Sequence, residues 1–105
     1  MAINALVPRQ IKQPAEDRLY DFDFTNLLGA ATVAASPAPT VAQEKQNLIV
    51  GSVNVTLGAP VISSPKVQVR ISGGTAGEDY KITVVARDSA GNTLEADGHL
   101  QVREL

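Results

Sequence analysis

The chain has no cysteine and no tryptophan, and its single histidine is His99. Without cysteine there is no disulfide, no thiolate metal ligand and no cysteine nucleophile. A small secreted domain often depends on disulfides, so their absence favours assembly in a reducing cytoplasm. With one histidine and no thiol, a transition-metal site would have to be built from several carboxylates.

Clustered positive charge and long apolar runs are also missing. Nine basic residues stand against eleven acidic ones, and the formal net charge is -2. Because no lysine or arginine run occurs, we expect neither a nucleic-acid partner nor a membrane-surface partner. The apolar runs are too short to span a bilayer, and residues 1–8 do not look like a signal peptide. A soluble, unexported protein is therefore expected.

Aromatic residues are few, and three of the four fall between Tyr20 and Phe24, where they alternate with Asp21 and Asp23. Alternation of apolar and polar residues with period two is the pattern of a half-buried strand. The pattern predicts a strand with Tyr20, Phe22 and Phe24 on the core side.

Other short apolar segments are separated by glycine, proline and serine, which is typical of a sandwich or a barrel. They predict strands near 30–35, 48–50, 53–57, 61–62 and 67–71, with a long loop over 36–47. The last third predicts a β-hairpin. Residues 80–87 alternate, residues 88–92 form a turn cluster, and the return strand covers 93–103.

The sequence as a whole predicts an all-β protein with one β-sandwich domain over residues 18–105. Residues 1–17 are expected to form an extended N-terminal arm, because Pro8 and Pro14 favour extended geometry in the residues before them. Such an arm is either a loosely ordered terminus or a segment that docks on a neighbouring subunit.

No constellation for catalysis, metal binding or cofactor binding is evident. Paired acids occur at 16–17, 21 and 23, 78–79, and 95 and 97, a composition that suits glycosidase chemistry or calcium. None has EF-hand spacing, and both the nucleophile elbow and the phosphate loop are absent. His99 should point outward from the last strand. We therefore predict no catalytic residue, no metal and no cofactor.

The segment from Gly77 to Val84 resembles the tyrosine corner of Ig-like sandwiches. In that motif a tyrosine near the start of the penultimate strand bonds through its hydroxyl to upstream backbone. Tyr80 would take that role here, so the resemblance implies that the sandwich is Ig-like. The Cys-Trp-Cys framework of antibody domains is missing.

Most of the chain also resembles small virion proteins of tailed bacteriophages, described as fiber-tail adaptors or as neck and head accessory proteins. The parts that carry the resemblance are 12–14, 20–24, 67–80 and 80–104. It implies a non-enzymatic virion structural protein, assembled in the host cytoplasm and present in several copies per particle. Its partners would be other phage structural proteins of the tail, neck, fibre or capsid, without nucleic acid or membrane.

Three functions follow from these observations. The first is an adaptor that links fibre or tail components to the neck or tail, and the alternative is a capsid decoration (cement) protein. The third is an enzyme or carbohydrate-binding module, although a sugar site usually needs exposed aromatic platforms and all four aromatics are assigned to the core. For the adaptor, the candidate contacts are apolar residues of the arm and of the proline-broken segment: Ile3, Leu6, Val7, Ile11, Val33, Pro37, Pro39 and Val41.

Overall fold

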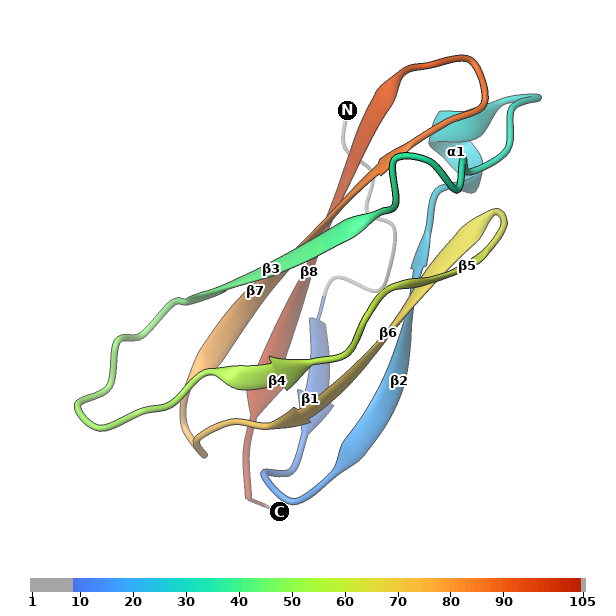
Figure 1. Cartoon of the computed structure of the whole chain (residues 1–105). Helices are drawn as coiled ribbons and strands as arrows, with labels where there is room; N and C mark the ends of the chain where they lie inside the picture. Colours follow the sequence, from blue (N-terminus) through green and yellow to red (C-terminus); the bar gives the residue numbers. More distant parts are fainter. Residues whose placement is uncertain (1–8, 105) are drawn as a thin grey trace.

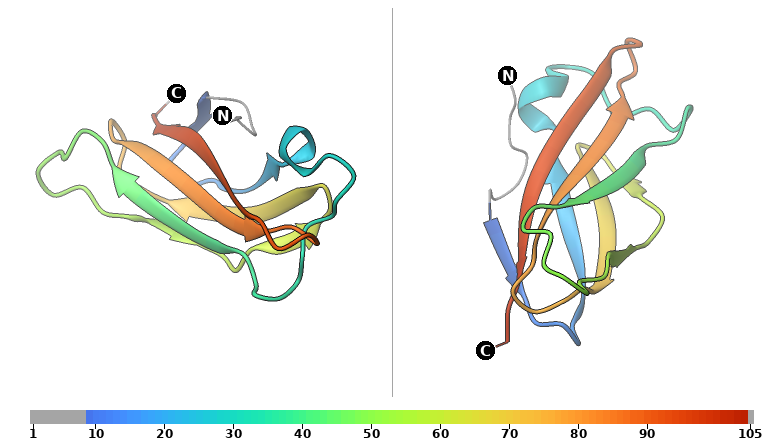
Figure 2. Two further views of the ribbon diagram at one scale, coloured as in Figure 1. Left: turned by 90° about the horizontal axis from the view of Figure 1, so that it is seen from above. Right: turned by 90° about the vertical axis from the view of Figure 1, so that its left-hand side faces the viewer.

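The computed structural model describes residues 9–104, which form two β-sheets packed face to face (Figure 1). The first sheet has the order β1 (Arg9–Lys12), β8 (Thr93–Val102), β7 (Asp79–Arg87) and β3 (Thr40–Lys45). The second has the order β2 (Asp17–Asp23), β6 (Lys66–Gly73) and β4 (Val55–Leu57), and β5 (Val61–Ser63) also pairs with β6. β1 lies parallel to β8, and every other pair is antiparallel. Figure 2 shows the two layers from above.

The core lies between the sheets, and the central strands β6 and β7 supply much of it. Both strands bury every second residue, as a strand with one face on a core must. The buried apolar side chains of the central strands are Val67, Val69, Ile71, Tyr80, Ile82, Val84 and Ala86. The predicted all-β sandwich is confirmed.

The aromatic strand is also confirmed, as β2. Phe22 and Phe24 are buried and Tyr20 is half-buried, while the aspartates face outward. Asp17 and Asp21 form ion pairs with Arg70 and Lys66, residues of the neighbouring strand β6. Alternation thus separates an apolar inner face from a charged outer face.

The predicted C-terminal hairpin is formed by β7 and β8, which pair from Asp79 opposite Gln101 to Arg87 opposite Thr93. Inward-facing residues of β8 are buried, and His99 is exposed on the outer face as expected.

The middle of the chain differs from the prediction. Residues 40–45, expected to lie in a loop, form the edge strand β3. Its polar side chains are compatible with a strand because Gln43 bridges the two sheets. The Gln43 amide donates to the Val55 carbonyl at 2.7 Å and accepts from the Val55 backbone N–H at 2.8 Å.

Two predicted strands are wrong. Residues 48–50 lie in the loop between β3 and β4, and their side chains are exposed. In 30–35 only Val33 makes a β-bridge, to Asp88. These short apolar runs match a strand in composition but have no neighbouring strand to extend the pairing. The short helix α1 (Thr25–Leu28) follows β2, and no helix within residues 9–104 is long and apolar enough to cross a membrane.

The described part of the predicted N-terminal arm also differs from an extended arm outside the domain. Arg9–Lys12 forms β1 and adds an edge to the first sheet. Lys12 is fully buried, and its Nζ donates to the carbonyls of Gln13 (2.8 Å), Pro14 (3.2 Å) and Gly73. Burial lowers the pKa of Lys12, although Glu16 and Asp17 nearby act in the opposite direction. The sandwich therefore includes residues that we had assigned to the arm.

Candidate contact surface

The structure distributes the predicted contact residues over different places. Ile3, Leu6 and Val7 lie outside the described residues. Ile11 is 48% exposed on β1, at one edge of the first sheet. The half-buried Val41 lies on β3, at the opposite edge, and the exposed Pro37 precedes that strand.

Val33 and Pro39 are buried in the folded domain. Val33 is 7% exposed and belongs to the core cluster. A side chain inside the domain offers no surface to a partner, so these two residues are corrected from contact residues to packing residues.

The exposed apolar side chains concentrate instead in the loop between β3 and β4. Seven large apolar residues among those described are exposed, and four of them lie in this loop. We call these four the apolar tip: Leu48 (72% exposed), Ile49 (39%), Val50 (99%) and Val53 (57%). The loop projects beyond both sheets at the left of Figure 1, and it is equally prominent in the left view of Figure 2.

Glu78 holds the first half of this loop. Its side chain is fully buried just before β7. The carboxylate accepts hydrogen bonds from the backbone N–H groups of Asn47 (2.6 Å), Leu48 (3.3 Å) and Ile49 (3.0 Å). Three consecutive amides thus converge on one buried acid, which fixes the backbone of the loop.

The carboxyl group of Glu78 is ionised at neutral pH. Burial by itself would raise its pKa, because the charged form loses hydration. Backbone N–H groups of Ile49, Asn47 and Asp79 donate to the charged form and outweigh burial, so that the pKa falls to about 2. The charge is therefore used to order backbone.

Tyr80 holds the second half of the loop. Its hydroxyl donates to the carbonyl of Val53 at 2.6 Å and accepts from the backbone N–H of Thr75 at 3.0 Å. The Thr75 hydroxyl in turn accepts from the Val53 backbone N–H at 2.9 Å. Lys45 adds a bond from its Nζ to the carbonyl of Ser52 at 3.1 Å.

Leu48 has a backbone conformation that leucine rarely adopts. Its φ is 55°, and it is the one non-glycine residue with positive φ in the described range 9–104. The left-handed region costs an L-residue about 1–2 kcal/mol. The amides of Asn47, Leu48 and Ile49 turn toward Glu78 in this conformation, so their hydrogen bonds offset the cost.

The sequence prediction missed the apolar tip. Leu48, Ile49 and Val50 have strand-forming side chains and were assigned to a strand, and Glu78 was noted only as one of a pair of acids. The charge-free stretch 46–54 is a signal that could have marked the loop. No local pattern could have joined it to an acid about 30 residues later.

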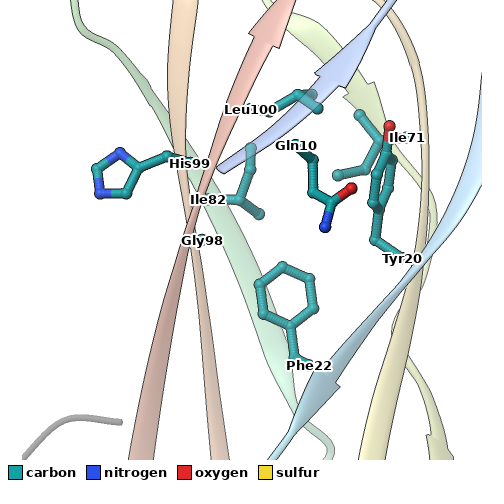
Figure 3. Close-up of a pocket in the computed structure, with 8 residues that line it drawn as sticks. All are labelled: Gln10, Tyr20, Phe22, Ile71, Ile82, Gly98, His99 and Leu100. Atoms are coloured by element: carbon teal, nitrogen blue, oxygen red, sulfur yellow. The ribbon is translucent and has the colours of Figure 1, made fainter. Parts of the chain in front are cut away.

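A small hollow opens between the sheets on the side of β1 and β2 (Figure 3). Its volume is about 20 Å³, enough for a water molecule. It is lined by Gln10, Tyr20, Phe22, Ile71, Ile82, Gly98, His99 and Leu100. Figure 3 shows the imidazole of His99 directed away from the other side chains. In the part of the chain that the structure describes, no three His, Cys, Asp or Glu residues group to hold a metal ion.

The family described as "Podophage GP4 fiber-tail adaptor protein gp77" matches residues 12–101. The matched span contains strands β2 to β7 and the whole apolar tip. No curated protein matches the chain.

Proposed function

The chain belongs to the podophage GP4 fiber-tail adaptor family, and we propose that it links fibre or tail components to the neck or tail of the phage particle. The family match over residues 12–101 carries the proposal. An adaptor is a structural protein of the virion that binds other tail or fibre proteins. The position of the link within the particle is the part that we propose.

The distribution of exposed apolar residues supports an adaptor with two contacts. The apolar tip follows β3 at one edge of the first sheet, and Ile11 lies on β1 at the other edge. Exposed apolar residues at opposite edges can bind two different partners without interfering. We keep Ile11, together with Ile3, Leu6 and Val7, as candidates for the second contact. Pro37 and Val41, at the β3 edge, stay further candidate contacts.

We also propose that the protein is not an enzyme. Most of the acids that suggested chemistry in the sequence have structural partners. Glu78 orders the loop, Asp79 pairs with Arg103 at 2.7 Å, and Asp97 accepts from the Thr83 hydroxyl at 2.7 Å. A carboxylate held in this way is not poised between two carboxyls across a cleft, as glycosidases require.

The strand layout supports an Ig-like sandwich. In Ig constant-type domains the first, second, fifth and fourth strands share one sheet, and the third, sixth and seventh share the other. Here β2, β6 and β4 form one sheet and β3, β7 and β8 the other, and the layout departs from the constant type in that β1 lies beside β8. Tyr80, at the start of the penultimate strand, bonds to backbone five residues upstream, as a tyrosine corner does.

Copy number and position in purified particles test the proposed function. We expect a few copies, in line with the symmetry of the tail, and a location at the neck or tail in a cryo-EM reconstruction. We further propose several copies per particle, assembly in the host cytoplasm, and no nucleic-acid or membrane partner. A copy number that matches the capsid lattice would instead support the alternative, a capsid decoration protein.

A further inference from the structure

We infer that the apolar tip is an insertion element whose side chains seat in an uncharged, apolar socket on another tail or fibre protein. The class of partner rests on the proposed function. The kind of surface rests on the geometry of the loop, which residues Leu48, Ile49, Val50 and Val53 define.

The chemistry of the loop determines the chemistry of the socket. Val50 is 99% exposed, and no residue between 46 and 54 carries a charge. Burial of the tip therefore removes apolar surface from water without leaving an ionised group of the loop unpaired. The exposed polar residues Gln46, Asn47 and Asn54 flank it, which gives an apolar centre with a polar rim, as in protein interfaces generally.

The loop is ordered before any partner binds. Glu78 fixes the backbone at Asn47 to Ile49, and Tyr80 fixes Val53. A contact loop that is already ordered loses less conformational entropy on binding, so more of the buried apolar area contributes to affinity. The left-handed Leu48 agrees with this, because strained backbone that the surroundings enforce is a feature of binding sites.

A second copy of the chain is a poorer partner than a different protein. A projecting loop is not complementary to itself across a two-fold axis, which brings the same patch of both copies together. The hollow of about 20 Å³ at β1 and β2 is too small to receive a leucine or a valine. A concave partner of different structure fits these constraints.

Incorporation into particles tests the inference with the full chain. Phage that lacks the gene is complemented with Val50→Asp or with the control Val61→Asp, which places the same charge on an exposed valine of β5. We expect Val50→Asp particles to contain at least about tenfold less of the protein and Val61→Asp particles the wild-type amount. Both purified variants should unfold at the wild-type midpoint. Wild-type incorporation of a folded Val50→Asp protein would overturn the inference.

A photo-crosslinking residue at position 50 identifies the partner in assembled particles. Crosslinks to an apolar segment of a tail or fibre protein support both the inference and the proposed function. Crosslinks to the major capsid protein would contradict the proposed position and still support the tip as an insertion element. Crosslinks to a second copy, or binding of the purified protein to phosphatidylcholine vesicles that Val50→Asp abolishes, would overturn the protein socket.

Glu78 is then a positioning residue, and a matched variant separates positioning from stability. Glu78→Gln keeps the size of the side chain and removes the charge that holds the loop. Asp88→Asn does the same to a buried acid at the other end of β7. We expect incorporation to fall severalfold for Glu78→Gln and to stay at the wild-type level for Asp88→Asn. An equal loss for both variants would show that Glu78 acts only through stability.

Discussion

Two loops are held by buried acids at the two ends of strand β7, and they present opposite surfaces: the loop between β3 and β4, and the turn between β7 and β8. Glu78 precedes the strand and Asp88 follows it, and both carboxylates are buried and accept several hydrogen bonds. The loop at Glu78 exposes leucine, isoleucine and valine. The turn at Asp88 exposes serine, alanine, glycine and asparagine.

The Asp88 bonds are all local. Its carboxylate accepts from the backbone N–H groups of Ala90 (3.0 Å) and Asn92 (2.7 Å) and from the Asn92 side chain (3.0 Å). The side-chain and backbone bonds from Asn92 lower its pKa, with burial acting against them. An aspartate that accepts hydrogen bonds from its own turn is sufficient to close a hairpin.

The Glu78 bonds connect residues 29 to 31 positions apart in the sequence. β3 and β4 belong to different sheets, so no hairpin register dictates the path of the chain between them. A long-range clamp therefore selects one conformation among many for this loop. A buried acid thus closes a turn at one end of β7 and orders a projecting surface loop at the other.

The largest effect is expected for Tyr80→Phe, which removes the second clamp of the loop. The hydroxyl of the fully buried Tyr80 bonds to the Val53 carbonyl and the Thr75 backbone N–H, so its loss leaves both backbone groups without that partner. We expect a loss of about 1–3 kcal/mol in the free energy of unfolding, measured by urea denaturation.

Tyr20→Phe is the matched control for that measurement. The Tyr20 hydroxyl is buried without a hydrogen-bond partner among the described residues. Its removal relieves an unsatisfied polar group, so the free energy of unfolding should stay unchanged or rise slightly. If Tyr80→Phe were as neutral as Tyr20→Phe, the Tyr80 hydroxyl would not be a clamp.

A smaller effect, on the hydrogen exchange of single loops, distinguishes the roles of Glu78 and Asp88. In Glu78→Gln, we expect faster hydrogen exchange at the amides of Asn47 and Ile49, because the neutral amide accepts more weakly than the carboxylate. The amides of Ala90 and Asn92 should exchange at the wild-type rate. Asp88→Asn should give the reverse pattern. Faster exchange at both loops in either variant would mean that the two loops open as one cooperative unit and that neither acid acts on its own loop alone.

The dependence of the free energy of unfolding on pH below neutrality gives a third test. The pKa of Glu78 is about 2 in the folded protein and near 4.5 when unperturbed, so its contribution to stability is complete above pH 4.5. It is lost as the pH falls toward 2, since the unfolded state binds the proton first. The wild-type advantage over Glu78→Gln should shrink across this window. An advantage that is constant from pH 6 to pH 2 would contradict the lowered pKa.

The same comparison explains which features could be predicted from the sequence. Alternation of apolar and polar residues predicted β2, β6 and the hairpin, because the buried face of each strand is encoded in that strand's own sequence. The Asp88 turn could be predicted from its local residue types. β3 was missed because Gln43 satisfies its inward polarity through Val55, a residue twelve positions away. The apolar tip was taken for a strand because its exposure depends on Glu78, far along the chain. Features set by neighbouring residues could be predicted from the sequence, and features set by long-range hydrogen bonds could not.

The smallest effect is expected at Leu48, and it is a gain in stability. Asparagine tolerates the left-handed region better than leucine, and Leu48 is 72% exposed, so Leu48→Asn relieves backbone strain and loses little packing. We expect the free energy of unfolding to rise by up to about 1 kcal/mol, measured by urea denaturation. If the apolar tip is an insertion element, the same variant should be incorporated less well into particles although it is more stable. A variant that is both less stable and less well incorporated would show that Leu48 contributes to the packing of the domain. The apolar tip would then have a structural role, as the Asp88 turn does.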